Sequence, residues 1–387
     1  MKKFLAFVMA ASMALSLAAC GGSSASTATS TTTEATSEAA ASTSGSKTDV
    51  AFVTDVGNID DQSFNQYTWQ GVQDFCSANS LNANYYRPTE DSDAARLEQM
   101  DNAVNDGAKS IVVAGYLFGN AIAEAQEKYP DVQFLALDVS ASDLGDKAPT
   151  ANTALITYKE EQAGYLAGYA AVYDGYKELG FLGGMAVPAV IRYGYGFVQG
   201  ADAAAQELGQ NIEINYFYGG QFYGDANITS RMEGWYANGT QIVFACGGGI
   251  YTSAVEAALK NNGYVIGVDV DQNYIGANGV ADGTYAYNPF ITSAMKGLTE
   301  AVNTALADID AGSWADIAGS NGNFGLEDGD YIGLPTDADS WNFESFTTDE
   351  YEEVKGKIKS GEITVDNSSD DATKPTVSEF TTVNYIQ

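Results

Sequence analysis

Residues 54–65 hold the side chains of this chain that are best suited to bind a ligand. The segment contains three aspartates, a glycine, the aromatic Phe64 and the amide Asn65. It follows an apolar run at 50–53, which predicts a buried strand, and precedes apolar residues at helical spacing over 64–76. The segment therefore lies at the carboxyl end of a strand, where open α/β sheets bind their ligands. Carboxylates, an amide and a ring suit a neutral polar ligand with a flat ring better than a phosphate.

The same side chains also have structural interpretations. Phe64 shares a helical stripe with Tyr67, so spacing alone favours core packing over ligand contact. Asn65 can bond a ligand or the local backbone near the helix start. Asp60 or Asp61 is expected to cap that helix by accepting its first N–H groups.

Further polar residues stand at or near predicted strand ends. Asp55 ends the first strand facing the predicted site, and ligand contact there is left open. Asp138 and Asp269 end two later apolar runs, where a buried carboxylate needs a partner. Gly248 lies in a glycine run after a strand, where the backbone could approach a ligand or simply turn into a helix. Lys296 stands among neutral neighbours in a predicted helix, which by itself indicates a solvated lysine.

Strand-like and helix-like segments alternate along the chain from residue 49. This alternation predicts parallel sheets covered by helices on both faces. This part of the chain has roughly 340 residues, more than a single hydrophobic core usually accommodates, so we expect two domains. Apolar runs predict further strands at 84–86, 110–114, 133–137, 154–157, 179–182, 212–217, 241–245, 264–268 and 284–287. Amphipathic stretches predict further helices at 93–105, 120–128, 160–173, 193–208, 225–236, 252–261 and 289–309.

Composition narrows the classes of function. Asp and Glu number 51 against 18 Lys and Arg, a balance that repels nucleic acid and anionic lipid. The chain has no histidine, which excludes Ser-His-Asp and Cys-His catalysis and any zinc site that needs imidazole. Chemistry based on carboxylates, Lys or Tyr remains open, so an enzyme is disfavoured without being excluded. Cys76 and Cys246 are expected to be small buried hydrophobes rather than a disulfide.

The N-terminus has the pattern of a secretion signal. Two lysines precede an apolar run at 4–17, which is too short to span a membrane permanently. The ending Leu17-Ala18-Ala19-Cys20 resembles a bacterial lipobox, in which Cys20 becomes the lipidated first residue; the alternative is an ordinary cleavage site. Residues 21–48 are mainly Ser, Thr, Ala and Gly and cannot bury enough apolar surface to order themselves. We therefore expect a signal peptide at 1–20, a disordered linker at 21–48, and a domain anchored by lipid to the outer face of the membrane.

Several segments along the chain form an ordered set of motifs. The first is Asp55-Val56-Gly57 with residues 60–65 (DDQSFN). It is followed by residues 134–138 (FLALD), 180–184 (GFLGG), Arg192 with Tyr193, 243–248 (VFACGG), 266–272 (IGVDVDQ), 292–296 (TSAMK) and 357–365 (KIKSGEITV). This set, which covers nearly all of 49–365, resembles the basic membrane protein (Bmp) family. These are lipoprotein substrate-binding proteins of ABC transporters, also known as purine nucleoside receptors.

The resemblance implies a fold and a mode of action. The fold is the α/β type I periplasmic-binding fold, with two Rossmann-like lobes that have parallel sheets and are joined by three crossing segments. We expect 49–157 plus 288–323 in the first lobe and 158–287 plus 324–387 in the second. The ligand lies between the lobes, and closure reports occupancy to the permease and ATPase of an importer.

The resemblance also implies roles for individual residues. Phe64 and Tyr193 stack on the two faces of a purine, while Asp138 accepts from its N–H groups. Asp269 binds ribose hydroxyls and Lys296 donates to the sugar. Tyr193 stands where family members commonly carry Phe, and it departs from that pattern by its added hydroxyl. The predicted ligand-binding residues are Asp55, Phe64, Asn65, Asp138, Tyr193, Gly248, Asp269 and Lys296.

Other motifs fail on inspection. Residues 194–200 approximate a dinucleotide fingerprint, but the third glycine comes one residue late. Residues from 269 begin like a calcium loop but lack its Gly and its final Glu. We therefore expect no cofactor, no metal and no catalytic residue. The prediction is a purine nucleoside-binding protein; the alternatives are a binder of another small polar ligand (a sugar or modified nucleoside), an exported nucleoside- or sugar-processing enzyme, and a receptor or antigen without a transporter.

Overall fold

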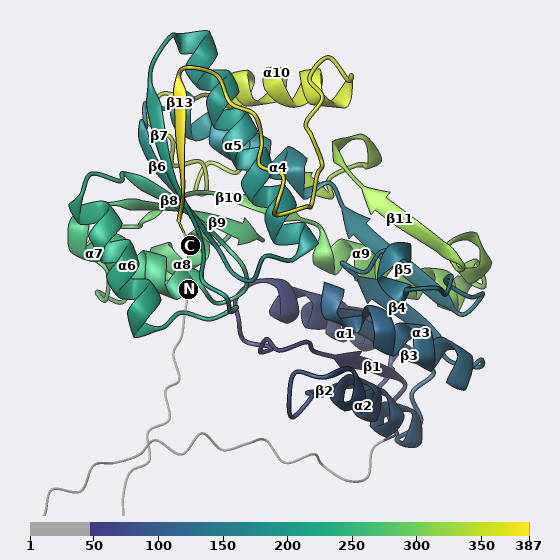
Figure 1. Cartoon of the computed structure of the whole chain (residues 1–387). Helices are drawn as coiled ribbons and strands as arrows, with labels where there is room; N and C mark the ends of the chain where they lie inside the picture. Colours follow the sequence, from purple (N-terminus) through teal and green to yellow (C-terminus); the bar gives the residue numbers. More distant parts are fainter. Residues whose placement is uncertain (1–46, 387) are drawn as a thin grey trace, which may run out of the picture. The chain divides into compact units, whose positions relative to one another are not determined.

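The computed structural model describes residues 47–386, which form two β-sheets with helices packed on their faces (Figure 1). The predicted signal peptide, Cys20 and nearly all of the predicted linker lie outside the described residues. Within 47–386, no helix is both long and apolar enough to cross a bilayer.

The first sheet is parallel throughout and has the strand order β11-β5-β4-β3-β1-β2. Its strands alternate in side-chain direction, so Val50 and Phe52 of β1 join the core with α1 and α9, whereas Ala51 and Val53 join the core with α2 and α3. The strands are β1 (Val50–Val53), β2 (Ala83–Tyr86), β3 (Ser110–Ala114), β4 (Gln133–Leu137), β5 (Thr153–Tyr158) and β11 (Ser320–Phe324). The helices are α1 (Phe64–Asn79), α2 (Asp93–Asn105), α3 (Gly119–Lys128) and α9 (Leu298–Ala311).

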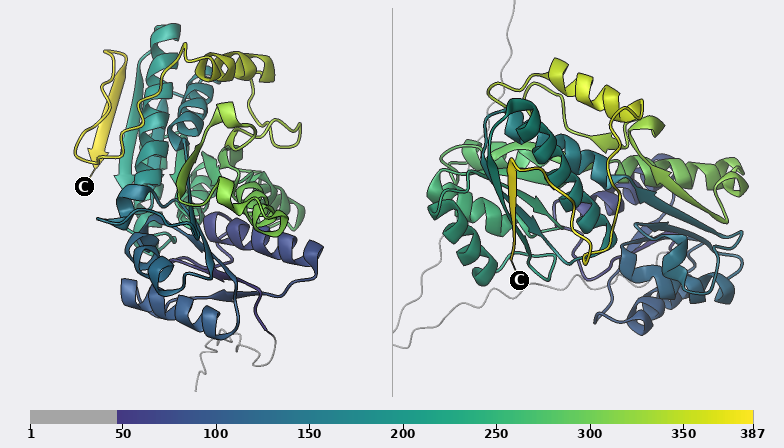
Figure 2. Two further views of the ribbon diagram at one scale, coloured as in Figure 1. Left: turned by 90° about the vertical axis from the view of Figure 1, so that its right-hand side faces the viewer. Right: turned by 45° about the horizontal axis from the view of Figure 1, so that its top comes forward.

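The second sheet has the order β12-β10-β9-β8-β6-β7-β13, with only β12 antiparallel to its neighbour. The C-terminal strand β13, yellow in Figure 2, forms one edge of this sheet. The strands are β6 (Glu178–Gly183), β7 (Ile212–Tyr218), β8 (Ile242–Cys246), β9 (Tyr264–Asp269), β10 (Phe290–Lys296), β12 (Ile332–Gly333) and β13 (Thr381–Ile386). The helices are α4 (Glu160–Tyr173), α5 (Pro188–Leu208), α6 (Ala226–Ala237), α7 (Tyr251–Asn261), α8 (Asn273–Ala281) and α10 (Thr348–Lys359).

Glycines let α4 and α5 pack backbone against backbone. A Cβ atom on Gly196 would lie 2.1 Å from the Glu161 carbonyl oxygen, and one on Gly164 would lie 2.1 Å from that of Tyr193. Such distances are far inside van der Waals contact, so only glycine fits at these positions. The glycines at 194–200 that approximate a dinucleotide motif therefore serve helix packing at least in part. This packing fixes the start of α4 beside Tyr193 of α5.

Three segments cross between the sheets and hydrogen-bond to one another. They are Lys159, between β5 and α4; Gly297, between β10 and α9; and the segment after β11. The Lys159 amide donates to Phe324 O at 2.8 Å, and the Gly297 amide donates to Tyr331 O at 2.8 Å. Lys159 and Glu327 also form an ion pair. The crossings thus form one connected hinge region.

Two sequence predictions about residues 284–309 are wrong. Residues 284–287 form no strand, and residues 290–296 are strand β10 rather than the start of a helix. A short buried strand shows no alternation, so its apolar pattern cannot be told from that of a buried helix. Because β10 pairs with β9, residues 290–296 lie in the second sheet, and the chain returns to the first lobe only at Gly297, not near residue 288.

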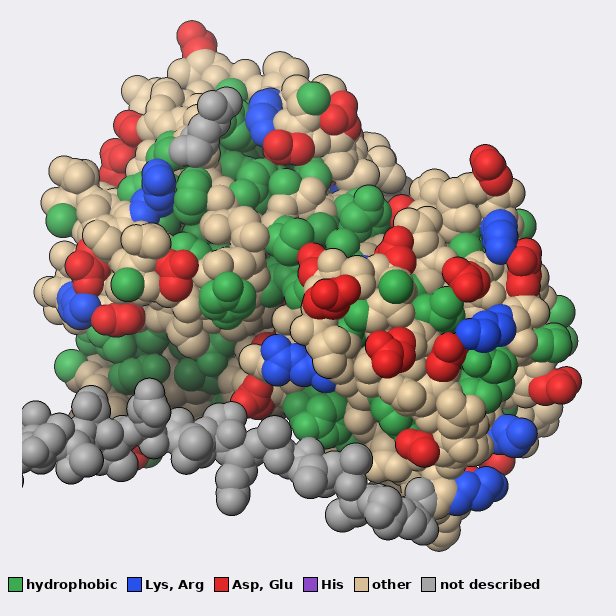
Figure 3. Space-filling model, turned by 60° about the horizontal axis from the view of Figure 1, so that its bottom comes forward, with side chains coloured by type: hydrophobic (Ala, Val, Ile, Leu, Met, Phe, Trp, Pro, Cys, Tyr) green, Lys and Arg blue, Asp and Glu red, His purple; other side chains and the backbone are tan. Residues whose placement is uncertain are grey.

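The remaining predicted elements agree with the structure to within a few residues, except α5, which begins at Pro188 rather than 193. Cys76 and Cys246 are buried and unbonded to each other, as expected. On the face in Figure 3, acidic side chains are spread over both lobes rather than gathered in one patch.

Candidate functional site

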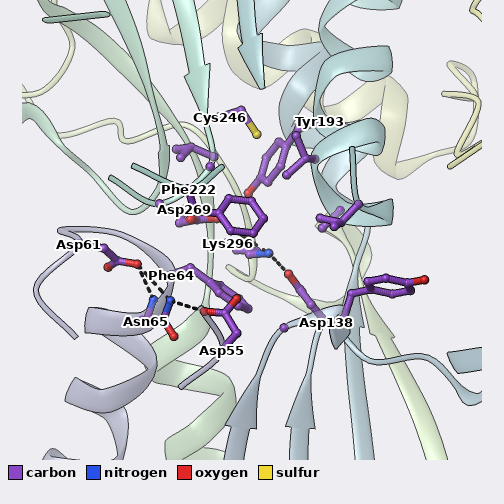
Figure 4. Close-up of a pocket in the computed structure, with 18 of the residues that line it drawn as sticks. Asp55, Asp61, Phe64, Asn65, Asp138, Tyr193, Phe222, Cys246, Asp269 and Lys296 are labelled. Carbon is purple, nitrogen blue, oxygen red and sulfur yellow. Dashed lines mark hydrogen bonds and ion pairs between the residues drawn. The ribbon is translucent and has the colours of Figure 1, made fainter. Parts of the chain in front are cut away.

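A pocket lies where the carboxyl ends of strands from both sheets meet (Figure 4). The space between its lining atoms amounts to about 600 Å³, which includes open solvent at its mouth. All eight predicted ligand-binding residues line it: Asp55, Phe64, Asn65, Asp138, Tyr193, Gly248, Asp269 and Lys296. The structure therefore brings together residues that are up to 241 positions apart in sequence, from Asp55 to Lys296.

The first-lobe wall is held by a local network of carboxylates and one amide. The Asn65 amide nitrogen donates to Asp55 Oδ1 at 3.1 Å and to Asp61 Oδ2 at 3.3 Å. The Gly57 amide also donates to Asp55 Oδ1, at 2.7 Å. Burial raises the pKa of Asp55, which these hydrogen bonds partly offset. The sequence left open whether the Asn65 side chain bonds a ligand or the local backbone. In the structure its amide nitrogen bonds two carboxylates rather than the backbone.

The sequence predicted that Asp60 or Asp61 caps helix α1, and in the structure Asp61 does so. Its carboxylate accepts backbone N–H groups of Ser63, Asn65 and Gln66 at 2.9, 3.0 and 3.1 Å. These are donors that a helix start cannot satisfy internally. Burial nevertheless raises the pKa of Asp61 to about 6. The cap leaves the Ser63 side chain free to reach the other lobe.

Asp138 and Asp269 occupy corresponding places in the two sheets. Asp138 directly follows β4 and Asp269 ends β9, and their φ angles are 57° and 67°. This left-handed region is uncommon for non-glycine residues, and aspartate tolerates it better than most. Such backbone strain gathers at functional sites, where the surrounding structure enforces it. Both carboxylates are thereby turned toward the space between the lobes.

Lys296 lies at the centre of a buried ionic cluster, defined here as Lys296, Asp138, Glu160, Asp269 and Arg192. The Lys296 ammonium is 2.6 Å from Asp138 Oδ2, 3.5 Å from Glu160 Oε1 and 3.8 Å from Asp269 Oδ1. Arg192 Nε donates to Glu160 Oε2 at 2.7 Å. The Lys296 side chain is only 2% exposed. The interpretation of Lys296 as a solvated helical lysine is therefore wrong, because it ends a buried strand.

The protonation states follow from burial and from this cluster. Burial lowers the pKa of Lys296, but the charges of Asp138, Glu160 and Asp269 outweigh it and raise the pKa overall. Burial would raise the pKa of Glu160, yet the charges of Arg192 and Lys296 hold it below its usual range. Burial raises the pKa of Asp138 to about 6, with Lys296 opposing the shift. Lys296 is therefore charged at neutral pH.

Aromatic rings surround the same ammonium. Its distance to the ring centroid is 4.6 Å for Phe64, 5.3 Å for Tyr158 and 5.8 Å for Tyr193. A cation within about 6 Å of a ring face is attracted by the ring quadrupole. Lys296 thus connects the ring of Phe64, from the first lobe, to that of Tyr193, from the second.

Sequence reasoning missed part of the pocket. Phe222 is the main omission, since it is a further ring in the lining (Figure 4). It lies in a loop after β7 that is rich in Gly and aromatic residues (219–224), and this composition at a strand end is the signal that could have found it. Glu160 and Arg192 were not predicted as partners of Lys296, because nothing local pairs them. The other missed lining residues are Asp61 as a wall residue, Gly115, Tyr116, Leu117, Val187, Ala189, Val190, Cys246 and Val268, whereas Gly247 belongs to the glycine run that the sequence singled out.

Comparison with known proteins assigns the chain to a family. Residues 48–369 match the Bmp family, described as ABC transporter substrate-binding protein PnrA-like. The chain belongs to the Bmp family. The CD4+ T-cell-stimulating antigen of Listeria innocua is 30% identical to this Bmp protein over 329 residues, covering 82% of this chain and 87% of the relative. The ABC transporter nucleoside-binding protein BmpA of Lactococcus lactis subsp. cremoris is 30% identical over 257 residues, or 62% and 70% of the two chains.

The fold of this Bmp protein is that of solute-binding proteins. An ABC transporter system solute-binding protein from Aeropyrum pernix K1 has a crystal structure with a TM-score of 0.69 to it, at 22% identity. The match covers 84% of this chain and 95% of the other. The predicted α/β fold with two parallel-sheet lobes is thus confirmed. As a member of a family of substrate-binding proteins, the chain is an extracytoplasmic substrate-binding component of an ABC transporter, and works with that transporter and a small ligand.

Proposed function

We propose that this Bmp protein binds a purine nucleoside in the pocket between its lobes and delivers it to the permease and ATPase of an importer. The observation that carries the proposal is the pairing of aromatic faces with a buried carboxylate at one site. Phe64 and Phe222 line the pocket with Asp138, and Asp138 Oδ1 has no hydrogen-bond partner among residues 47–386. A purine offers flat faces for the rings and N–H groups for the carboxylate.

The charge of the pocket supports a nucleoside over a nucleotide. Its lining includes the carboxylates of Asp55, Asp61, Asp138 and Asp269 against the single ammonium of Lys296, counted over residues 47–386. That ammonium is already surrounded by acidic groups. A phosphate would meet uncompensated negative charge in a low-dielectric site, which is costly. A neutral ligand with several N–H and O–H donors fits this environment.

The family resemblance supplies the assignment of the two ends of the ligand, and the pocket walls provide the side chains that it requires. Asp138 accepts from the base, with Phe64 and the second-lobe rings of Tyr193 and Phe222 against its faces. Asp269 accepts from ribose hydroxyls and Lys296 donates to the sugar. Asp55 and Asn65 complete the first-lobe wall, and the backbone at Gly248, whose φ of 51° suits glycine, lies at the second-lobe wall. The nucleoside-binding relative from Lactococcus supports the ligand class.

A panel of ligands tests the proposal. Protein unfolded and refolded to remove bound ligand should be stabilised by inosine, guanosine or adenosine, by about 2.7 kcal/mol at one hundred times the dissociation constant. Matched nucleoside monophosphates and free sugars should give much smaller shifts. Stabilisation by sugars alone would favour the alternative of another polar ligand. Appearance of free base or other product during incubation would favour an enzyme.

The variant Phe64→Ala separates ligand contact from core packing. Loss of one stacked face should weaken nucleoside binding by about 1–3 kcal/mol in titration calorimetry. Phe343→Ala is the matched control, because Phe343 packs on Trp341 and Phe346 outside the pocket. The control should lower stability and leave affinity unchanged. Equal affinity of Phe64→Ala and wild type would refute the role of Phe64 as a base platform.

The membrane anchor is a separate proposal that rests on the sequence of residues 17–20. We infer that Cys20 carries lipid and that the segment at 21–48 tethers the binding domain to the outer face of the membrane. Cys20→Ser should move the protein from the membrane fraction to the soluble fraction of expressing cells. Retention of the variant in the membrane would contradict the anchor.

A further inference from the structure

Two tyrosines of helix α5 differ in what their hydroxyls contact. The side chains of Tyr193 and Tyr195 are each 1% exposed. The Tyr195 hydroxyl donates to the Asp370 carbonyl oxygen at 3.2 Å. The Tyr193 hydroxyl has no hydrogen-bond partner among residues 47–386. An unpaired buried hydroxyl costs free energy. The presence of a hydroxyl at Tyr193 therefore needs an explanation, whereas the hydrogen bond of Tyr195 accounts for its own.

The surroundings of Tyr193 fix where its hydroxyl points. The ring meets Phe244 edge to face, with centroids 5.9 Å apart and an interplanar angle of 86°. The hydroxyl is directed toward the part of the pocket lined by Phe222, Asp269 and Lys296 (Figure 4). The ring is therefore held in place from behind while its polar end faces the cavity.

None of the charged groups nearby is hydrogen-bonded to the Tyr193 hydroxyl within residues 47–386. Asp269 Oδ2 accepts from Ser63 Oγ at 2.5 Å, and Asp269 Oδ1 faces Lys296 at 3.8 Å. The Lys296 ammonium faces Asp138, Glu160 and Asp269. A ligand in the pocket that the hydroxyl faces can therefore supply its partner.

We propose that the Tyr193 hydroxyl donates a hydrogen bond to an acceptor atom of the bound nucleoside and thereby discriminates against ligands that lack this atom. This inference rests on the proposed function. Stacking alone would not distinguish Tyr from Phe at position 193, whereas a hydrogen bond to the ligand requires the hydroxyl of Tyr193. Burial, followed by the charges of Asp269 and Glu160, raises the pKa of Tyr193 well above its usual value. The hydroxyl thus keeps its proton at neutral pH and acts as a donor.

The acceptor on the ligand is a ring nitrogen of the base or an oxygen of the sugar. A ligand of the same shape without that atom would leave the buried hydroxyl unpaired in the closed protein. Sites built to hydrogen-bond a ligand group discriminate against analogues that lack it for this reason. Tyr193 is therefore a specificity-determining residue of the pocket.

The test compares wild type with Tyr193→Phe, using inosine and analogues that each lack one acceptor. The analogues are 3-deazainosine, 7-deazainosine, 2′-deoxyinosine and 5′-deoxyinosine. Tyr193→Phe should bind inosine about threefold to tenfold more weakly than wild type, the loss expected for one neutral hydrogen bond. One analogue should show the same loss with wild type and bind Tyr193→Phe as inosine does. That pattern identifies the acceptor atom.

Stability provides a second readout. The ligand-free Tyr193→Phe protein should unfold at a temperature equal to or above that of wild type, because the substitution removes an unpaired polar group. Tyr195→Phe, the matched control, should unfold at a lower temperature and bind inosine as wild type does. Unchanged inosine affinity in Tyr193→Phe, or a destabilised ligand-free variant, would overturn this inference alone. Failure of wild type to bind any purine nucleoside would overturn the proposed function together with it.

Discussion

Asp138 and Asp269 hold corresponding places in the two lobes but are stabilised in different ways. Each stands at the carboxyl end of a buried strand with a positive φ, and each finds a partner from the opposite lobe. Asp138 of the first lobe pairs with Lys296 of the second at 2.6 Å. Asp269 of the second lobe accepts from Ser63 of the first at 2.5 Å. One contact is an ion pair and the other is a hydrogen bond from a neutral hydroxyl.

The difference shows that the two lobes contribute differently: one supplies the positive charge, and the other supplies a hydroxyl positioned to donate a hydrogen bond. The second lobe supplies Lys296, which faces three carboxylates at once. The first lobe supplies the capped start of α1, whose geometry presents Ser63 to Asp269. Each aspartate therefore has its partner from the opposite lobe only when the lobes meet. Contacts made only in the closed state are what allow a ligand to shift a hinge equilibrium.

The largest expected effect comes from removing the charge that the carboxylates share. Lys296→Met should destabilise the protein by about 3–5 kcal/mol, because it leaves buried carboxylates without a counter-charge. Urea unfolding at neutral pH measures the loss. Lys260→Met is the control, since Lys260 pairs with Glu233 and Glu256 on the surface and should change stability little. Similar losses in the two variants would mean that the ionic cluster contributes no more than a surface pair.

A smaller effect concerns the titration of Asp138 in the ligand-free protein. Burial raises its pKa to about 6, so the folded protein holds a proton that the unfolded chain releases near pH 4. The contribution of Asp138 to the free energy of unfolding of wild type should therefore fall as the pH rises from about 4 to about 6. Asp138→Asn has no such proton, so its stability relative to wild type should rise by up to about 1.4 kcal/mol per pH unit over that range.

Unfolding midpoints in urea at several pH values between 4 and 7.5 measure this difference. Asp310→Asn, at an exposed position of α9, reports the effect of losing one carboxylate on the surface. A stability difference between Asp138→Asn and wild type that does not change with pH would contradict the raised pKa.

A third test, with an effect of similar size, concerns the hydrogen-bonded aspartate alone. Ser63→Ala removes the hydroxyl that donates to Asp269 and should cost about 1.5–3 kcal/mol, the value of a hydrogen bond to a charged group. A double-mutant cycle with Asp269→Asn isolates the coupling between the two side chains. Additive effects would show that the contact between the lobes at this point contributes nothing to stability.

Several features of the site could be predicted from local sequence because they depend on near neighbours. The strand 50–53, the following loop and helix α1 are close in sequence, so the position of Phe64 and Asn65 at a strand end followed from periodicity. The cap by Asp61 followed from the chemistry of helix starts. The roles of Asp138, Asp269 and Lys296 came instead from a family resemblance, which places distant residues together without explaining how.

Other features could not be predicted because they depend on contacts between distant segments. Strand β10 was taken for a helix, since a strand buried in the middle of a sheet carries no alternating pattern. That error made Lys296 look solvated. Phe222 was missed although its loop also places glycine and aromatic residues after a strand, because no local rule tells which of several strand-end loops faces the ligand.

By itself, the sequence determined the alternating α/β architecture, the exclusion of histidine chemistry and an acidic site with a ring at the first strand end. Those conclusions rest on composition and on periodicities set by backbone geometry, which operate over a few residues. Only the tertiary structure decided that Lys296 is buried among Asp138, Glu160 and Asp269, and that Ser63 reaches Asp269. These contacts join the two lobes, and the pKa values within them depend on burial, which no segment has until the whole chain is folded.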